Sequence, residues 1–582
     1  MREPLRIANC SGFYGDRFSA AREMVEGGPI DILTGEYLAE LTMLILWKAR
    51  QRDPSAGYAA TFLRQMEQVL GTALERGIRV VTNAGGLNPA GLAERLRELA
   101  GRLGLSPRIV HLEGDDLMPR LAELRAAGHH LRHLETGTTL EEAGVQPLTA
   151  NAYLGGWGIA QALAQGADIV VCPRVTDASL VLGPAAWRFG WAADDWDRVA
   201  GAVVAGHVIE CGAQATGGNY SFFREVRGLE HPGFPIAEVF EDGSSVITKH
   251  PGTGGQVSVG TVTAQLLYEI EGPRYVNPDV VARFDSIRLS QEGPDRVRIS
   301  GVRGEPAPPE TKVSLNYAGG YRNSMSFVLT GLDVEAKADL ARRTLFEGLG
   351  GEGAFEAVDV RLLRLTGGEA QLRVTVKDPD PRKVGRAFSA RVIEMALASY
   401  PGFHTTTPPT PETAYGVHWP ALVPAQLVDQ VVVAEDGSRH PVGRPPTRSV
   451  PADRPEPGEA EGLERFGPTE PAPLGVLFGA RSGDKGGNAN CGVWARSPQA
   501  FEWLDGFLTA ERFRELIADG AEPPPGEVRR YRLPNLLALN FVVVGLLGEG
   551  VASSTRPDPQ AKGLGEVLRS RSAPLPRRLL AG

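Results

Sequence analysis

Cysteine is scarce in this sequence, and no two copies form a C-x-x-C motif. The chain has 582 residues, and its four cysteines, Cys10, Cys172, Cys211 and Cys491, are far apart. This scatter is typical of a protein from a reducing compartment and argues against a disulfide framework. We expect each cysteine to be a small core residue, although Cys10 and Cys211 lie beside glycine-rich turns where a thiol could react.

Long apolar runs and a surplus of positive charge are also missing. The longest apolar run, residues 536–547, is well short of the roughly 20 residues that span a bilayer, and we interpret it as a buried strand. Lysine and arginine number 61 against 70 aspartates and glutamates, a net charge of −9. The first residues lack the pattern of a signal peptide. We therefore expect a cytoplasmic protein with neither nucleic acid nor membrane as partner.

Several familiar motifs are absent, and each absence argues against a class of enzyme. Residues 9–17 do not match G-x-G-x-x-G, and Lys249 with the glycines after it lacks the spacing of a phosphate-binding P-loop. No G-x-S-x-G is present, which weakens an α/β-hydrolase interpretation. The histidines form no metal signature, and Asp115 and Asp116 are weak candidates for a divalent cation. The sequence predicts no metal site and leaves the cofactor unknown.

Short β-type runs alternate with amphipathic helical stretches over the first 190 residues. We expect strands at 5–8, 30–33, 78–82, 109–112 and 168–172, with helices such as 38–51, 59–75 and 89–103 between them. This alternation is typical of a parallel sheet with crossover helices. The predicted fold class is therefore α/β.

After about residue 196 the sequence becomes rich in strands and turns. Strands are expected at 207–212, 246–249, 256–260, 297–302 and 312–317, followed by a strand–helix–strand–helix unit at 324–399. Antiparallel additions to the sheet or an α+β subdomain would produce this pattern. We predict an N-terminal domain over 1–445, with a break into two subdomains near 196–320 left open. A Pro- and Gly-rich linker over 446–473 and a ferredoxin-like α+β domain over 474–573 follow.

Polar, glycine-rich loops follow the expected parallel strands, where the ligand crevice of such a sheet lies. Glycine lets the backbone approach a ligand, and helix N-termini offer N–H groups to an anion. Ordinary turn and cap chemistry explains about half of these residues, so the argument rests on five such loops sharing one edge. These loops give the candidate ligand-binding residues Asn9, Ser11, Gly12, Asn83, Gly85, Gly86, Glu113, Asn151 and Arg174, and the candidate catalytic acids Asp16 and Asp177.

Three later segments add candidates. Glu210 is the leading candidate for a general base, because an acid at a strand end beside an apolar site can have its pKa raised towards neutrality. Residues 480–490 look like an anion-binding nest, with a free surface turn as the alternative. The candidate ligand-binding residues from these segments are Gly217, Gly218, Lys249, Gly254, Arg481, Ser482, Lys485, Gly486 and Gly487.

Taken together, these segments resemble the acyclic terpene utilisation (AtuA) family. The resemblance is carried by IANCSGFYGDR, VVTNAGGLNP, LTANAYLGGWGIAQALAQGADIVVCPRVTDASL, ECGAQATGGNYS and ARSGDKGGNANCGVW. It covers about 5–445 and 474–573, and it implies an N-terminal acyclic-terpene-utilisation domain joined to a ferredoxin-fold domain. It also implies catabolism of acyclic terpenoids or related branched-chain acids as acyl-CoA intermediates. It supplies no set of catalytic residues.

The expected function is that of a catabolic enzyme of hydratase or lyase type, acting on a small carboxylic acid or its acyl-CoA thioester. Many anion-binding loops without a nucleotide fingerprint favour this, since backbone N–H groups stabilise a developing oxyanion. The alternative is a non-catalytic partner or assembly subunit of a multi-component acyl-CoA enzyme, docking through the C-terminal domain. A nucleotide-dependent ligase or kinase would need a carboxylate-held Mg²⁺ site. A homo-oligomer stays open.

Overall fold

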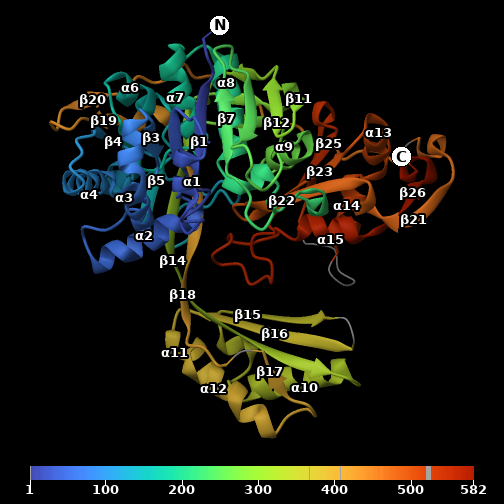
Figure 1. Cartoon of the computed structure of the whole chain (residues 1–582). Coiled ribbons are helices and arrows are strands. Elements are labelled where there is room, and N and C mark those ends of the chain that lie inside the picture. The colour runs from blue at the N-terminus through green and yellow to red at the C-terminus, as the bar shows by residue number, and fades with distance from the viewer. Residues whose placement is uncertain (1, 366–367, 407, 461, 519–525, 582) are drawn as a thin grey trace. The chain divides into compact units, whose positions relative to one another are not determined.

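The chain folds into two compact units that interleave along the sequence. The structure is a computed structural model and describes residues 2–365, 368–406, 408–460, 462–518 and 526–581. Unit 1 comprises Met1–Leu315, His418–Val551 and Gln560–Gly582, and unit 2 comprises Asn316–Val417 and Ala552–Pro559. Figure 1 follows the chain by residue number. The limits of the predicted linker and its flanking domains stay predictions.

A mixed sheet of eleven strands forms the centre of unit 1, in the order β11-β12-β8-β7-β1-β2-β3-β6-β4-β19-β20. Its middle is parallel and consists of β1 (Leu5–Asn9), β2 (Ile32–Gly35), β3 (Arg79–Thr82), β6 (Ile169–Val171) and β4 (Ile109–Glu113). Antiparallel strands flank it: β7 (Pro235–Val239), β8 (Ser245–Lys249), β12 (Arg296–Ser300), β11 (Arg288–Gly293), β19 (Val431–Val433) and β20 (Arg439–Pro441). The predicted α/β class, with antiparallel additions to a parallel sheet, is confirmed.

Helices bury both faces of the parallel strands. On one face, side chains such as Ala8 and Leu33 share a core with Phe62 and Leu96 from the crossover helices α1 (Ala20–Glu26), α3 (Ala60–Glu75) and α4 (Pro89–Arg102). Residues alternate across a strand, so Ile7 and its neighbours point to the opposite face. The elements α2 (Glu40–Arg52), α5 (Leu121–Ala126), α6 (Trp157–Ala164), α7 (Ser179–Phe189), α8 (Trp196–Ile209) and α9 (Val259–Leu266) complete the helices of this region.

Two of the expected strands are wrong. Residues 207–212 end α8 and begin the 3₁₀ turn Gly212–Thr216, and residues 256–260 form a loop that starts α9. Every residue of α8 from Val199 to Ile209 is buried. A helix buried on all sides has no polar stripe, so its valines and glycines show no 3.6-residue period and resemble a buried strand.

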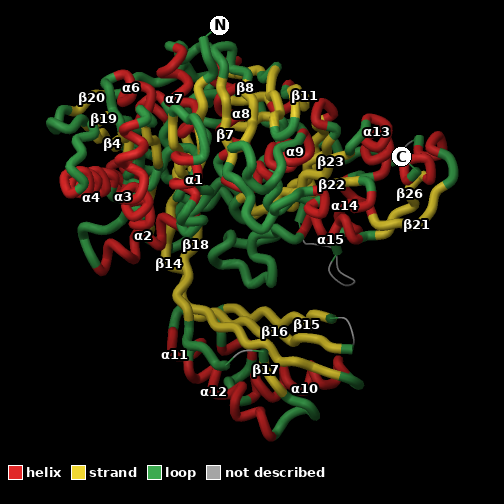
Figure 2. The backbone as a smooth tube through the Cα atoms, in the orientation of Figure 1, coloured by secondary structure: helices red, strands yellow, loops and turns green. Residues whose placement is uncertain are grey.

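Unit 2 is a sheet with helices on one face (Figure 2). β14 (Glu310–Thr330) and β18 (Thr413–Pro424) both cross the boundary between the units, and β14 also pairs with β5 (Pro147–Ala152) of unit 1. Within unit 2, the order is β15-β16-β14-β17, with β15 (Ala357–Arg364), β16 (Glu369–Asp378) and β17 (His404–Thr405). The helices are α10 (Val334–Glu347), α11 (Pro381–Val384) and α12 (Arg386–Glu394). The four expected elements are present, but β15, which was not predicted, lies between α10 and β16 and makes the order strand–helix–strand–strand–helix.

The C-terminal domain is ferredoxin-like, as predicted. Its antiparallel sheet has the order β22-β23-β25-β24, with β22 (Phe478–Lys485), β23 (Asn488–Ala495), β25 (Ala538–Val543) and β24 (Val528–Leu533). The other elements are α13 (Pro498–Phe507), α14 (Ala510–Leu516), α15 (Leu564–Ser570), α16 (Arg577–Leu580), β21 (Thr469–Pro473) and β26 (Ser572–Pro576). β25 is buried throughout, which confirms the buried strand expected within 536–547.

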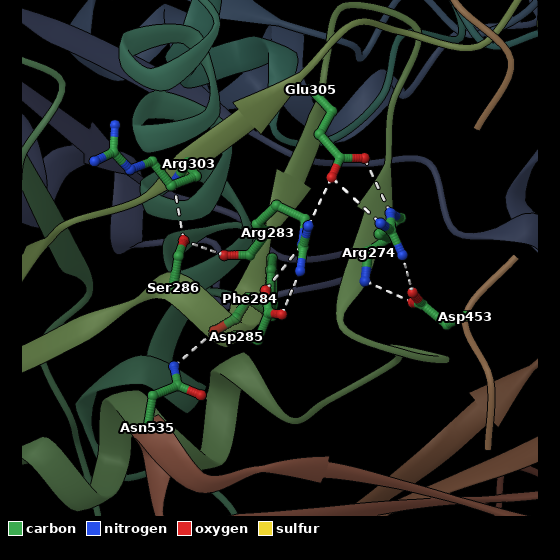
Figure 3. A network of polar contacts seen from close by, with 9 residues as sticks. All are labelled: Arg274, Arg283, Phe284, Asp285, Ser286, Arg303, Glu305, Asp453 and Asn535. Carbon is green, nitrogen blue, oxygen red and sulfur yellow. Dashed lines mark hydrogen bonds and ion pairs between the residues drawn. The ribbon is translucent and has the colours of Figure 1, made fainter. Parts of the chain in front are cut away.

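A polar network joins a small three-stranded sheet to segments far away in sequence (Figure 3). This sheet consists of β9 (Arg274–Val276), β10 (Val281–Arg283) and β13 (Arg303–Glu305). The Arg274 guanidinium contacts Glu305 at 2.9 Å and Asp453, in the predicted linker, at 2.6 Å. Asn535 of the C-terminal domain donates to the carbonyl oxygens of Phe284 (2.8 Å) and Ile287 (2.9 Å). The C-terminal domain is therefore fixed to the rest of unit 1 by hydrogen bonds. Among the described helices, none is long and apolar enough to cross a bilayer.

Candidate functional site

Polar side chains converge at the carboxyl ends of the parallel strands. Asn9 ends β1, Glu36 follows β2, Asn83 follows β3 and Arg174 follows β6, and all four are buried. The Asn83 amide nitrogen donates to Glu36, and its oxygen accepts from the Tyr37 N–H at 2.8 Å. Asn9 Nδ2 donates to the last turn of α8, to the carbonyl oxygens of residues 209 (2.6 Å) and 210 (2.9 Å). The strand ends thus hold both the loop after β2 and the end of α8.

Arg174 links this group to a more exposed carboxylate. Its Nη2 lies 2.6 Å from Asp177 Oδ1, and the Arg174 side chain is 4% exposed against 33% for Asp177. The guanidinium also lies over the Tyr153 ring, 4.4 Å from its centroid. Burial raises the pKa of Glu36, the charge of Asp177 raises it further, and Arg174 opposes both. Glu36 therefore keeps its proton at pH values where an exposed glutamate is ionised.

Glu210 and His207 form the second acid–base pair, at the end of α8. His207 Nδ1 lies 3.4 Å from Glu210 Oε1, but within the described residues neither ring nitrogen of His207 nor Glu210 Oε2 has a hydrogen-bond partner. Burial raises the pKa of Glu210, Asp177 and Glu269 add to this, and Arg174 and Lys485 oppose it. Burial lowers the pKa of His207 to about 4. Burial therefore favours the uncharged form of both the acid and the base.

The C-terminal domain places two more charges beside this pair. Glu269, after α9, has a positive φ of 56°, which is uncommon outside glycine and marks a position fixed by its surroundings. The Asn490 side chain accepts from the Glu269 N–H at 2.8 Å and donates to the Leu267 carbonyl oxygen at 2.9 Å. Lys485 Nζ donates to the Glu269 carbonyl oxygen at 3.0 Å. Strands β22 and β23 therefore fix the backbone that brings Glu269 to the site.

The cysteines next to the site are thiols rather than thiolates. Burial raises the pKa of Cys211, and the negative charges of Glu210 and Glu269 raise it further. Burial also raises the pKa of Cys10, to about 12. Since the thiolate is the nucleophile, this environment favours a packing role for both residues.

Asp115 and Asp116 make hydrogen bonds within the local structure. Asp115 Oδ2 accepts from Asn151 Nδ2 at 2.8 Å and from the Arg174 N–H at 3.3 Å, and burial raises its pKa to about 7. Asp116 Oδ1 accepts from the Met118 N–H at 2.9 Å, which is turn-capping chemistry. Nowhere in the described ranges do three or more His, Cys, Asp or Glu side chains gather in a way that could hold a metal ion.

Many sequence-predicted residues meet at this site. The site consists of seven residues: the predicted Glu210, Asp177, Arg174, Asn9 and Asn83, together with Glu36 and His207. Asn151 joins it through Asp115, and Lys485 joins it through Glu269. The β1 loop lies beside it: Gly12 donates to Asp16 Oδ2 at 2.7 Å, and a Cβ on Gly12 would come within 2.8 Å of the Cys211 backbone. Ser11 forms hydrogen bonds within that loop, and the Gly85 N–H donates to the Cys172 carbonyl oxygen.

Other predicted residues have their contacts elsewhere. Glu113 contacts Arg439 at 2.8 Å and His111 at 3.1 Å, and Lys249 contacts Asp295 at 3.2 Å. Four of the predicted glycines pack against other residues: Gly86 on Leu46, Gly217 on Val226, Gly218 on Ala213 and Gly254 on Gly228. The Ser482 hydroxyl donates to the carbonyl oxygen of residue 562 and accepts from the N–H of residue 565.

One local prediction at the site is wrong: Glu210 does not end a strand but caps α8, for the reason given above. Residues 480–490 belong to a hairpin of β22 and β23 in which Lys485 pairs with Asn488, and Gly486 and Gly487 make the turn. Anion binding by this segment stays a prediction. A Gly-Gly pair between two strands is a hairpin signature, and here Gly486 has a φ of 61°, a left-handed conformation that favours glycine. Arg481 lies over the Tyr268 ring at 4.3 Å, and its Nη2 lacks a hydrogen-bond partner among the described residues.

Sequence reasoning missed three members of the site. Glu36 follows β2 directly, so the rule that selected Asn83 and Arg174 would also have selected it. His207 lies inside a segment taken for a strand, and Glu269 reaches the site only through contacts with β22 and β23. No local pattern identifies either residue.

The fold defines an α/β protein with a C-terminal ferredoxin-like domain. Residues 5–434 match the family model described as "Acyclic terpene utilisation family protein AtuA", and residues 472–573 match the AtuA ferredoxin-like domain. The chain belongs to the AtuA family, and membership implies involvement in acyclic terpene utilisation. No curated protein matches the chain. A crystal structure of S. aureus homoserine dehydrogenase is matched at 10% identity over 67% of this chain and 84% of that one, with a TM-score of 0.13, too low to support an argument.

Proposed function

We propose that the chain is an enzyme of acyclic terpenoid or branched-chain acid catabolism with hydratase or lyase chemistry. Its substrate would be an unsaturated carboxylic acid or the acyl-CoA thioester of one. The observation that carries the proposal is a buried acid with a raised pKa near a partly exposed, ion-paired carboxylate. Burial raises the pKa of Glu210, and Asp177, which contributes to that rise, lies 2.6 Å from the Arg174 guanidinium.

Such a pair suits the reversible addition of water to a C=C bond conjugated with a carbonyl group. A base takes a proton from a water molecule as the water oxygen bonds to the β-carbon, and an acid delivers a proton to the α-carbon. Two carboxyl groups in different environments can take these roles. Asp177 would be the base, because it is partly exposed and ion-paired with Arg174, and Glu210 would be the acid, because burial raises its pKa.

Cationic side chains would stabilise the charge that develops on the carbonyl oxygen. Arg174 is buried, and its Nε has no partner among the described residues. Lys485 lies close enough to Glu210 to affect its pKa. A cation in a water-poor site stabilises an oxyanion far better than one in bulk water.

The test is a hydration assay on the full chain with acyclic α,β-unsaturated branched acids and their CoA thioesters. Glu210→Gln and Asp177→Asn keep the side-chain shape and remove proton transfer, so each should lower kcat by about 10²–10⁴-fold. Glu230→Gln changes an exposed glutamate and should leave kcat within twofold. If the unmodified chain hydrates none of these compounds, or if both variants turn over normally, the proposal is wrong. The first outcome would favour the alternative, a non-catalytic partner or assembly subunit.

A thermal-shift measurement separates binding from chemistry. Because a ligand that binds only the folded state raises Tm, the substrate should raise Tm of the inactive Glu210→Gln variant as it does that of the unmodified chain. Loss of both the shift and the activity in this variant would assign Glu210 to binding instead.

A further inference from the structure

Unit 2 contains a cavity of about 180 Å³ on the sheet face that carries no helices. Met325, Phe327, Val374 and their neighbours pack against the helices, so alternation turns Arg322, Ser324, Arg373 and Thr375 to the opposite face. Residues 554–557 and 559 also line the cavity. Its volume is several times the roughly 30 Å³ that a water molecule occupies in the liquid.

The cavity lining is cationic and rich in hydroxyl groups. Arg322, Arg373 and Arg556 line it, no lining residue is an acid, and Ser324, Thr375, Ser554 and Thr555 supply hydroxyls. Ser324 Oγ and Thr375 Oγ1 lie 2.6 Å apart in a hydrogen bond. Asp359, which pairs with Thr375 in the strand register, is bonded to Arg361 at 2.8 Å. The acid nearest in register is therefore already neutralised by another arginine.

Two of the cavity arginines, Arg322 and Arg373, lie close enough for their positive charges to repel each other. Arg322 is engaged through Nη1, which donates to the carbonyl oxygens of Ala552 (2.9 Å) and Ser554 (3.4 Å). Burial lowers the pKa of Arg322, and the charge of Arg373 lowers it further. No carboxylate of the described residues contacts the Arg373 guanidinium. Desolvated like charges are costly unless an opposite charge lies between them.

We propose that this cavity binds a phosphate group. A tetrahedral dianion would accept forked N–H bonds from the arginines, whose planar donors match phosphate geometry, and further bonds from the hydroxyls. The phosphate is either inorganic phosphate or a phosphate ester such as the 3′-phosphate of coenzyme A; both present the same chemistry to these donors. This proposal is independent of the proton-transfer function, because binding involves no turnover.

Calorimetry on the full chain with inorganic phosphate, coenzyme A and 3′-dephospho-coenzyme A tests the proposal. Arg373→Ala should weaken phosphate binding at least tenfold, which corresponds to about 1.4 kcal/mol. Arg343→Ala is the control: Arg343 is an exposed arginine of α10 in the same unit, pairs with Asp339 at 2.9 Å and does not line the cavity. The affinity of this control variant for phosphate should stay within twofold of that of the unmodified chain.

The three ligands distinguish the sources of the phosphate. If coenzyme A binds more tightly than inorganic phosphate, and 3′-dephospho-coenzyme A does not, the ligand is a phosphate ester. If coenzyme A binds no more tightly than inorganic phosphate, the ligand is inorganic phosphate. Arg373→Ala should not lower Tm, because it relieves repulsion on Arg322; should it fail to fold, Arg373→Gln replaces it with the same expected loss of affinity. The proposal is overturned if the unmodified chain binds none of the three ligands, or if the folded Arg373 variant binds them as tightly.

Discussion

Replacing Glu210 by glutamine should stabilise the protein increasingly as the pH rises. The pKa of Glu210 is raised in the folded state, chiefly by burial, whereas a glutamate in the unfolded chain has a pKa of about 4.3. The folded state therefore holds the proton more tightly. The stability that this contributes is complete below the unfolded pKa and is lost as the pH rises towards and through the folded pKa.

The size of the effect follows from the linkage relation. Between the unfolded and the folded pKa, each pH unit costs the unmodified protein about 1.4 kcal/mol that the glutamine variant does not lose. Glutamine has nearly the same shape, and Glu210 Oε2 has no hydrogen-bond partner among the described residues, so the substitution removes no bond from that atom. Other titrating groups are present in both proteins and largely cancel in the difference.

Urea unfolding of both proteins at half-unit steps from pH 5 to pH 7 measures this difference directly. The stability advantage of Glu210→Gln should grow with a slope approaching 1.4 kcal/mol per pH unit, while the exposed control Glu230→Gln should show no slope. A difference that stays constant across the range, or a variant less stable than the unmodified protein at pH 7, would refute the assignment of Glu210 as a buried neutral acid.

Three further outcomes are expected. Asp115→Asn should gain stability relative to the unmodified chain between pH 5 and pH 7, because burial raises the Asp115 pKa to about 7; a flat difference in urea unfolding would contradict this. Asn490→Ala should cost about 1–3 kcal/mol, because it leaves the Glu269 N–H and the Leu267 carbonyl oxygen unpaired, and it should lower kcat. An unchanged kcat would show that the contacts made by β23 are not needed for the activity of the site. Lys485→Ala should move the alkaline limb of the pH–rate profile upward, because it removes a cation that lowers the Glu210 pKa; a downward move would argue against Glu210 as the acid.

The sequence by itself determined the parts of this protein that local patterns encode. The five parallel strands and their crossover helices follow from periods of 2 and 3.6 residues, and Asn9, Asn83, Arg174 and Asp177 follow from their place after those strands. Three of the segments that resemble the AtuA family include these loops, and the family matches over residues 5–434 and 472–573 confirm the resemblance.

Only the tertiary structure decided how the acid–base site is completed. α8 is buried on all sides, so its sequence carries no amphipathic period and the positions of His207 and Glu210 could not be predicted from it. Glu269 depends on hydrogen bonds from Asn490 and Lys485, more than 200 residues later in the chain. The raised pKa of Glu210 likewise comes from burial and from charges brought together by folding. Such contacts are set by packing between distant segments, and a pattern within one segment cannot encode them.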